Sequence, residues 1–280
     1  MNKVRIVTDS TCDLSKDLLE QYKISMVPLK VIFGDEVYQD GIEMSAKEFY
    51  QRLPQAAKLP TTSQPAPGEF ASCYESLAQE GCSVISIHIS GELSGTVRSA
   101  ELGGSMVPEL DLHIVDSKTV SSGLALIVIA AAKAAIEGKT TAEILSLVES
   151  LVSKSHLYFV LDTLDYLHKG GRIGRASALL GNLLNIKPIM TFKDGVVTPV
   201  DKVRGRNRAF ETILNLTKQQ AGSGKIVCGL LHSDDFSGVM KLHERVVKEL
   251  DCAEIQIGEI GPVIGTYAGP GGIGLAFYTL

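Results

Sequence analysis

Short apolar runs alternate with segments that carry helix signals throughout the first half of the chain. The short apolar runs are typical of strands. The segments after them begin with cap-type residues, and Ser45 and Thr140 each open a capping box that predicts the start of a helix. Alternation of this kind predicts a mainly parallel sheet covered by helices. The predicted strands are 4–8, 26–33, 83–89 and 112–115, and the predicted helices lie at 14–21, at 68–79 and after residues 45, 95, 121 and 140.

The second half combines strands and helices in a different order. Residues 189–192 and 196–200 flank the turn at 193–195 and predict a β-hairpin. The whole pattern predicts an α/β fold of two domains, with a mainly parallel sheet in an N-terminal domain (1–155) and a mixed sheet in a C-terminal domain (156–280). The remaining predicted strands are 156–161, 225–231, 254–257 and 274–278, and the predicted helices lie at 208–219 and after residue 237.

Two stretches depart from this alternation. Residues 53–68 hold four prolines and predict an ordered loop or a crossing segment. Residues 123–136 are the most apolar stretch, but Lys133 interrupts them, and they are shorter than the roughly 20 residues that a membrane-spanning helix needs. We therefore expect a buried core helix here and no stable insertion into a membrane.

Composition narrows the class of protein. The net charge of −5 over 280 residues argues against a nucleic-acid-binding protein, whose affinity rests on clustered Lys and Arg. The five cysteines form no C-x-x-C pair, which is typical of reduced thiols in the cytoplasm and gives no sign of a zinc site. The N-terminal residues lead directly into a strand pattern, with no apolar core of a signal peptide. We expect a cytoplasmic protein with no metal and no cofactor.

The segment 88–96 is the sharpest candidate site. It lies at the carboxyl end of a predicted strand and at the start of a helix, where ligands bind in open α/β sheets and where free N–H groups favour an anion. Ser94 and Thr96 add hydroxyl donors, while Gly91 and Gly95 allow a ligand to approach the backbone. The alternative is a polar turn in which Ser94 only caps the helix, and the local pattern leaves both interpretations open.

A second candidate is the segment 60–65, Pro-Thr-Thr-Ser-Gln-Pro. The prolines restrict the backbone and so preset where the hydroxyls of Thr61 and Thr62 point. A single anion held between this segment and the Ser94 turn is chemically sensible, although such a run is more often a solvated loop. Residues 9–11 also follow a strand, and they serve either as a helix cap or as a ligand.

Two enzymatic or cofactor motifs fit poorly. The stretch 91–95 departs from the G-x-S-x-G elbow of serine hydrolases on both sides of Ser94, and nothing singles out a histidine partner. The stretch 269–274 matches G-x-G-x-x-G, but it precedes a closing strand rather than a helix. We expect a glycine-rich wall there and no dinucleotide site.

Seven basic residues form two neighbouring clusters near the ends of the predicted hairpin. Arginine is suited to bidentate recognition of carboxylate and phosphate. In a chain of negative net charge, two such clusters favour a surface that docks a partner or binds phosphate. The alternative is that these residues are scattered over the surface and only contact solvent. The residues are Lys169, Arg172, Arg175, Lys202, Arg204, Arg206 and Arg208.

Taken together, the motifs resemble the DegV family of bacterial fatty-acid-binding proteins. No single motif is decisive, but their order and spacing are specific, and the similarity extends from about residue 3 to the C-terminus. The segments that carry the resemblance are 8–14, 60–65, 90–96, 169–175 and 261–271.

The resemblance implies two α/β domains with a long-chain fatty acid between them. It implies that Thr62 and Ser94 hold the carboxylate, with Thr61, Gly95 and Tyr267 in the same ligand-binding set. It further implies that the protein presents this carboxylate to a separate ATP-dependent fatty acid kinase for acyl-phosphate formation and phospholipid synthesis. Residues expected to face the kinase are Arg172, Arg204 and Arg206.

One position departs from the family pattern. Many members have a histidine where this chain has Tyr267, and a phenol donates a hydrogen bond but does not carry the charge of a protonated imidazole. A role that depends on a protonatable imidazole at this position, such as presentation of the carboxylate to the kinase, would be weakened or replaced in this chain. The resemblance implies a carrier that is not itself a catalyst. Two alternatives stay open, a stand-alone serine-dependent acyl hydrolase and a regulatory or interaction protein that binds no lipid.

Overall fold

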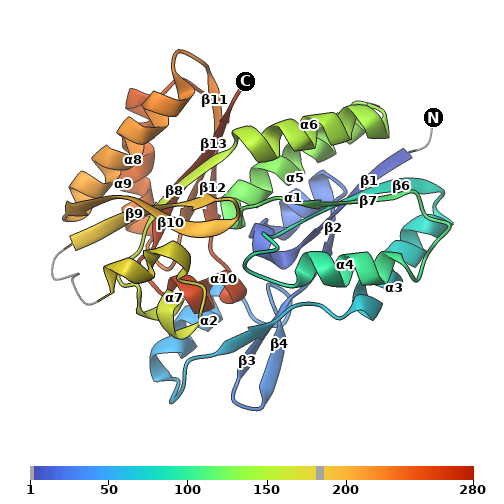
Figure 1. Cartoon of the computed structure of the whole chain (residues 1–280), viewed down its shortest axis with the longest axis horizontal. Coiled ribbons are helices and arrows are strands. Elements are labelled where there is room, and N and C mark those ends of the chain that lie inside the picture. Colours follow the sequence, from blue (N-terminus) through green and yellow to red (C-terminus); the bar gives the residue numbers. More distant parts are fainter. Residues whose placement is uncertain (1–2, 181–185) are drawn as a thin grey trace.

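The computed structural model describes residues 3–180 and 186–280, which form three β-sheets flanked by helices (Figure 1). A four-stranded sheet with its helices forms a first lobe, and a six-stranded sheet with its helices forms a second lobe. A small three-stranded sheet packs against helix α10 (Pro262–Ala268). The combination of a parallel sheet and a mixed sheet confirms the predicted α/β fold class.

The four-stranded sheet is parallel throughout and has the order β2-β1-β6-β7. Adjacent residues of a strand point to opposite faces, so Val7 and Val84 pack with α3 and α4, while Ile6 and Ile85 pack with α5 and α6. Because both faces are buried, these strands are near-continuous apolar runs in the sequence. The strands are β1 (Lys3–Asp9), β2 (Ser25–Val27), β6 (Cys82–His88) and β7 (Leu112–Asp116), and the helices are α1 (Lys16–Gln21), α3 (Pro67–Gln79), α4 (Thr96–Gly104), α5 (Ser121–Ile136) and α6 (Thr141–Lys154).

The prediction of one strand at 26–33 is wrong, because this segment contributes to two sheets. Strand β2 ends at Val27, and β3 (Lys30–Phe33) belongs to the three-stranded sheet of order β4-β3-β5. Pro28 lies between them and has no backbone N–H to donate to a neighbouring strand. The other members of this layer are β4 (Glu36–Gln39), β5 (Thr61–Ser63) and helix α2 (Ala46–Arg52).

The six-stranded sheet has the order β10-β9-β8-β13-β11-β12, in which only β11 and β12 pair in parallel. The predicted hairpin is confirmed, since β9 and β10 pair antiparallel on either side of a tight turn. Helices α8 and α9 cover one face of the sheet. The elements are β8 (His156–Val160), β9 (Ile186–Lys193), β10 (Val196–Arg204), β11 (Ile226–His232), β12 (Cys252–Glu259), β13 (Ile273–Thr279), α7 (Asp165–Lys169), α8 (Arg206–Ala221) and α9 (Phe236–Glu249).

Helix α5 joins the two lobes. It contacts β1 of the parallel sheet and β11 and β13 of the six-stranded sheet, and almost all of its side chains are buried. The apolar stretch at 123–136 is thus the core helix that the sequence predicts. Among the described residues, no helix combines the length and the apolar character needed to cross a membrane. The division into domains at residue 155 stays a prediction.

Candidate functional site

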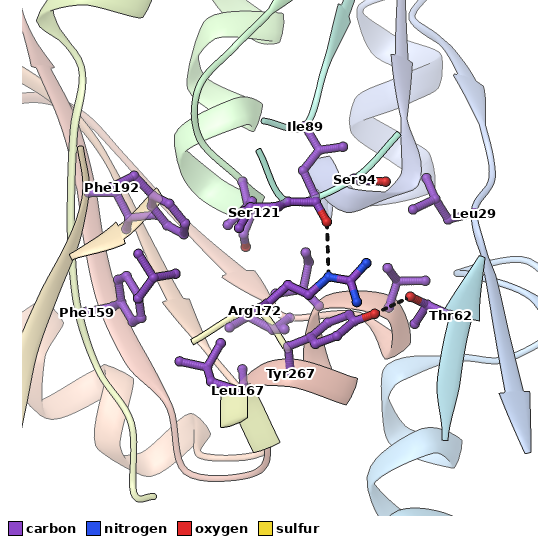
Figure 2. A pocket seen from close by; sticks show the side chains of 18 of the residues that line it. Leu29, Thr62, Ile89, Ser94, Ser121, Phe159, Leu167, Arg172, Phe192 and Tyr267 are labelled. Carbon is purple, nitrogen blue, oxygen red and sulfur yellow. Dashed lines mark hydrogen bonds between the residues drawn. The ribbon is translucent and has the colours of Figure 1, made fainter. Parts of the chain in front are cut away.

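A cavity of about 350 Å³ lies between the two lobes (Figure 2). Its volume falls within the range of about 300–1,000 Å³ that is typical of small-molecule sites. We call it the central cavity. Its walls come from the loops after β6 and β7, from β5, β8, β9, β10 and β11, from α10 and from the segment after α7. The lining residues are Leu29, Thr62, Ser63, Gln64, Ile89, Leu93, Ser94, Gly95, Val120, Ser121, Leu157, Phe159, Leu161, Leu167, Arg172, Phe192, Val197, Leu231, Ile260, Val263, Ile264, Tyr267, Ala268 and Ile273.

One end of the central cavity is apolar. Phe159 and Phe192 stack with ring centroids 5.5 Å apart and an angle of 23° between their planes. Figure 2 shows these rings and Leu167 on the opposite side of the cavity from Thr62 and Leu29. The six-stranded sheet supplies this end, because its strands turn alternate side chains away from α8 and α9 and toward the cavity.

The other end of the cavity is polar and is organised by Tyr267. The phenol oxygen of Tyr267 lies 2.6 Å from Oγ1 of Thr62, with either group able to donate the hydrogen bond. The Arg172 guanidinium lies over the Tyr267 ring, 5.1 Å from its centroid. Its Nε donates to the Leu93 carbonyl at 3.2 Å (Figure 2), and its Nη1 donates to the Gly170 carbonyl at 2.9 Å. These contacts fix a cation and several hydroxyls at one end of an apolar space.

Strand β5 places Thr62 in this cluster. Thr62 pairs with the buried Val31 of β3, so the two side chains lie on the same face of the three-stranded sheet. Helix α10, which carries Tyr267, packs against β3 and β5. The prediction of an ordered loop or a crossing segment at 53–68 thus missed a strand, because β5 lies within it.

Gly95 allows the second hydroxyl-bearing turn to approach the first. A Cβ atom at Gly95 would lie 2.1 Å from the side-chain oxygen of Gln64, so any other residue at this position would displace the Gln64 amide. Gln64 Nε2 in turn donates to Ser99 Oγ of α4 at 2.8 Å. Ser94 follows the same turn, and its Oγ lies 2.8 Å from Thr96 Oγ1. The structure thus brings Thr62 and Ser94 to one cavity, as the sequence suggested for a single anion.

The other predicted ligand-binding and partner-binding residues divide between several places. Thr61 does not line the central cavity, because it alternates with Thr62 on β5; it lines a neighbouring smaller cavity. Arg204 is exposed on β10, outside the central cavity. Arg206 forms an ion pair with Asp235 at 2.6 Å and donates to the Gly271 carbonyl, so its guanidinium is engaged within the chain.

The residues after β1 and β6 have structural roles at this edge of the sheet. Asp9 caps the short helix at 10–12, and it also accepts hydrogen bonds from the Ile89 N–H and from His88, both at 3.0 Å. His88 contacts Ser86 Oγ at 2.7 Å, and Ser86 Oγ contacts the Tyr74 hydroxyl at 2.9 Å. All four side chains in this chain of hydrogen bonds are buried, so it offers no accessible nucleophile.

Two aspartates that accept hydrogen bonds from the start of α10 form a feature that the sequence interpretation missed. We call Asp13 and Asp40 the acid pair. Asp13 Oδ1 accepts from the Gly261 N–H at 2.9 Å, and Asp40 Oδ1 accepts from the Val263 N–H at 3.3 Å. Burial raises the pKa of Asp40 to about 7 and also raises the pKa of Asp13 well above its usual range. The partners are more than 200 residues apart in the chain, so no local pattern marks them.

Comparison with known proteins gives a consistent result along the whole chain. The family model described as "Uncharacterised protein, DegV family" matches residues 3–280. A DegV domain-containing protein from Halalkalibacterium halodurans is 39% identical over 280 residues, covering 99% of each chain.

Solved structures agree in fold. A DegV family protein from Thermus thermophilus, reported for its fatty acid binding, is 38% identical with a TM-score of 0.95, covering 99% of this chain and 100% of that one. DegV from Bacillus subtilis, a fatty acid binding protein, is 34% identical with a TM-score of 0.92, covering 100% of both chains.

Proposed function

This chain belongs to the DegV family, and from that membership we propose that it binds one long-chain fatty acid in the central cavity. In the proposed orientation the acyl chain packs against Phe159 and Phe192, and the carboxylate accepts hydrogen bonds from Thr62, Ser94 and Tyr267. The fatty acid binding of the two structural relatives supports this proposal.

The observation that carries the proposal is the polarity of the cavity lining. Apolar side chains dominate it, the hydroxyls of Thr62 and Tyr267 lie at one end, and Arg172 is the single charged side chain among the described lining residues. Because Arg172 has no carboxylate beside it among the described lining residues, the central cavity favours a ligand with an anionic head group. An apolar body with an anionic head is the chemistry of a fatty acid.

The energetics assign different roles to the two ends. Burial of fourteen methylenes contributes on the order of 10 kcal/mol at about 0.8 kcal/mol each. A hydrogen bond to a charged head group contributes about 1.5–3 kcal/mol. The acyl chain therefore dominates the affinity, and the polar end determines which way round the ligand binds.

We further propose that the bound carboxylate is presented to a separate ATP-dependent fatty acid kinase. The kinase would transfer the terminal phosphoryl group of ATP to a carboxylate oxygen, with ADP as the leaving group, and the acyl phosphate would enter phospholipid synthesis. In this proposal the chain is a carrier, and the kinase performs the chemistry. Arg172 and the exposed Arg204 are the proposed contacts to the kinase, whereas the pairing of Arg206 with Asp235 leaves it less suited to that role.

The hydrolase alternative gains no support from the surroundings of Ser94. Its Oγ contacts Thr96 Oγ1, and no histidine is among the described residues that line the central cavity. A serine nucleophile needs an adjacent base to remove its proton.

Copurified lipid provides the direct test. We expect mass spectrometry of the denatured protein to release one long-chain fatty acid per chain. After delipidation, Ser94→Ala should weaken binding of palmitate about tenfold and slow its phosphorylation by a fatty acid kinase with ATP, because one donor to the carboxylate is lost. Ser72→Ala, at an exposed serine of α3, is the matched control. Absence of both copurified lipid and saturable palmitate binding in the unmodified protein would rule out the proposal.

A further inference from the structure

A second cavity, of about 220 Å³, adjoins the polar end of the central cavity. We call it the basic cavity. It shares Thr62, Arg172 and Tyr267 with the central cavity, so these three residues form a common wall. The basic cavity is lined by Leu59, Pro60, Thr61, Thr62, Tyr166, Lys169, Gly170, Arg172, Thr266 and Tyr267.

The charge of the basic cavity is positive. Lys169 and Arg172 are its charged lining residues, and no carboxylate lines it among the residues that the structure describes. None of the ion pairs within residues 3–180 and 186–280 involves either cation. Two cations without counter-ions in a concave site attract an anion.

Hydroxyl groups complete the lining. Thr61, Thr62, Tyr166 and Tyr267 contribute hydroxyl-bearing side chains to the wall, while the hydroxyl of Thr266 donates to the Pro262 carbonyl. Hydroxyl donors and a lysine ammonium are suited to the oxygens of a phosphate group. The turn after α7 brings Lys169 to this wall, and Gly171, with a φ of +72°, provides the left-handed backbone of that turn.

The orientation of Arg172 links the two cavities. Two of its guanidinium nitrogens donate to the Leu93 and Gly170 carbonyls, and the plane lies over the Tyr267 ring. Among the described residues the third nitrogen, Nη2, makes no hydrogen bond, so its N–H groups can donate to a ligand. A head group at the common wall can therefore contact Arg172, while a further anionic group attached to it would extend toward Lys169.

We propose that the basic cavity binds a phosphate-sized oxyanion next to the carboxylate end of the central cavity, with Lys169 and Arg172 as its cations. This inference rests on the proposed fatty acid site, because it places the oxyanion beside the bound head group. The oxyanion has two possible sources, a phosphoryl group attached to the lipid head or free inorganic phosphate. Lys169 has no role in binding an unmodified fatty acid, since it does not line the central cavity.

The first arm of the test uses an attached oxyanion. Delipidated protein is titrated with palmitate and with a phosphonate analogue of palmitoyl phosphate in which a methylene replaces the bridging oxygen. Lys169→Met should weaken analogue binding about tenfold and leave palmitate binding unchanged, because one charge-assisted contact is lost. Lys169→Arg should retain most of the analogue affinity. Lys241→Met, at an exposed lysine of α9, is the matched control.

The second arm uses inorganic phosphate as the probe on palmitate-loaded protein. Saturable phosphate binding that is lost in Lys169→Met would identify free phosphate as the source, whereas tighter binding of the analogue alone would identify an attached group. The proposal is overturned if Lys169→Met changes neither titration. Failure of the unmodified protein to bind palmitate would instead remove the proposed function, so the two failures are distinguishable.

Discussion

At the scale of single residues, Tyr267 connects three segments of the polar end. Its hydroxyl contacts Thr62 of β5, its ring lies beneath the Arg172 guanidinium, and its ring edge packs on Gly170. A Cβ atom at Gly170 would lie 2.4 Å from this ring, so a glycine is required for the packing. The ring therefore orders the polar end by packing, and the hydroxyl does so by hydrogen bonding.

The variant Tyr267→Phe separates these two contributions. We expect a ten- to hundredfold loss of palmitate affinity, since a hydrogen bond to a charged head group contributes about 1.5–3 kcal/mol, while the ring packing and the fold are kept. Methyl palmitate, which has no charged head, should bind both proteins alike in displacement titrations. Tyr38→Phe on β4, outside the central cavity, is the control. Equal loss for the acid and the ester would contradict a role for the hydroxyl at the head group.

The residues of the polar end differ in how far the sequence could indicate them. Thr62 lies in a hydroxyl-rich segment between prolines and Ser94 lies in a strand-to-helix turn, and these local patterns suggest an anion site. The contact of Arg172 with Leu93 joins residues 79 positions apart, so no local pattern indicates it. Thr61 was grouped with Thr62 because the strand that turns their side chains apart could not be recognised in three polar residues between prolines.

At the scale of elements, α10 shows how a short helix depends on distant contacts. A helix of seven residues is marginal in isolation. The acid pair holds its first N–H groups, and the Tyr50 hydroxyl donates to the Ile260 carbonyl at 3.1 Å just before it. The sequence interpretation assigned no helix to 262–268 and expected only a glycine-rich wall at 269–274, directly after α10. Helices α2 and α6 were predicted, because the capping boxes at Ser45 and Thr140 are local signals.

The variant Asp40→Asn tests how the acid pair affects stability. Burial raises the pKa of Asp40 from 3.8 to about 7, the nearby Asp9 adds to this, and hydrogen bonds from Ser10 and the Val263 N–H oppose it. A raised pKa in the folded state means that the neutral form is favoured there. The stability that Asp40 contributes is thus present below about pH 4 and is lost as the pH rises through about 7, by up to about 4 kcal/mol.

The measurement is urea unfolding across this pH range. The free energy of unfolding of the unmodified protein should fall between about pH 4 and pH 7, and Asp40→Asn should remove much of that slope, because its side chain is neutral throughout and can still accept from the Val263 N–H. Asp35→Asn, at an exposed turn, should keep the slope. Parallel pH profiles for Asp40→Asn and the unmodified protein would show that Asp40 does not titrate in this range.

At the scale of the whole molecule, several contacts connect the two lobes around the central cavity. Ser90 Oγ, after β6, donates to the Gly195 carbonyl in the β9–β10 turn at 2.9 Å, and this contact is buried. Lys133 of α5 forms an ion pair with Glu254 of β12 at 2.6 Å. Helix α5 itself packs on both sheets (Figure 1). A ligand in the central cavity therefore touches both lobes and the helices that join them.

This arrangement predicts that a fatty acid stabilises both lobes together. Palmitate at about 100 times its dissociation constant should raise the free energy of unfolding by about 2.7 kcal/mol, since it binds the folded state alone. Hydrogen exchange should slow in β8 and β9 of the second lobe and also in the loop after β6 of the first, because residues from all three line the cavity.

Butyrate, with the same head group and almost no acyl chain, should give no measurable stabilisation, because the buried methylenes supply most of the affinity. Protection confined to one lobe, or equal stabilisation by butyrate, would contradict a ligand that bridges the lobes with its acyl chain.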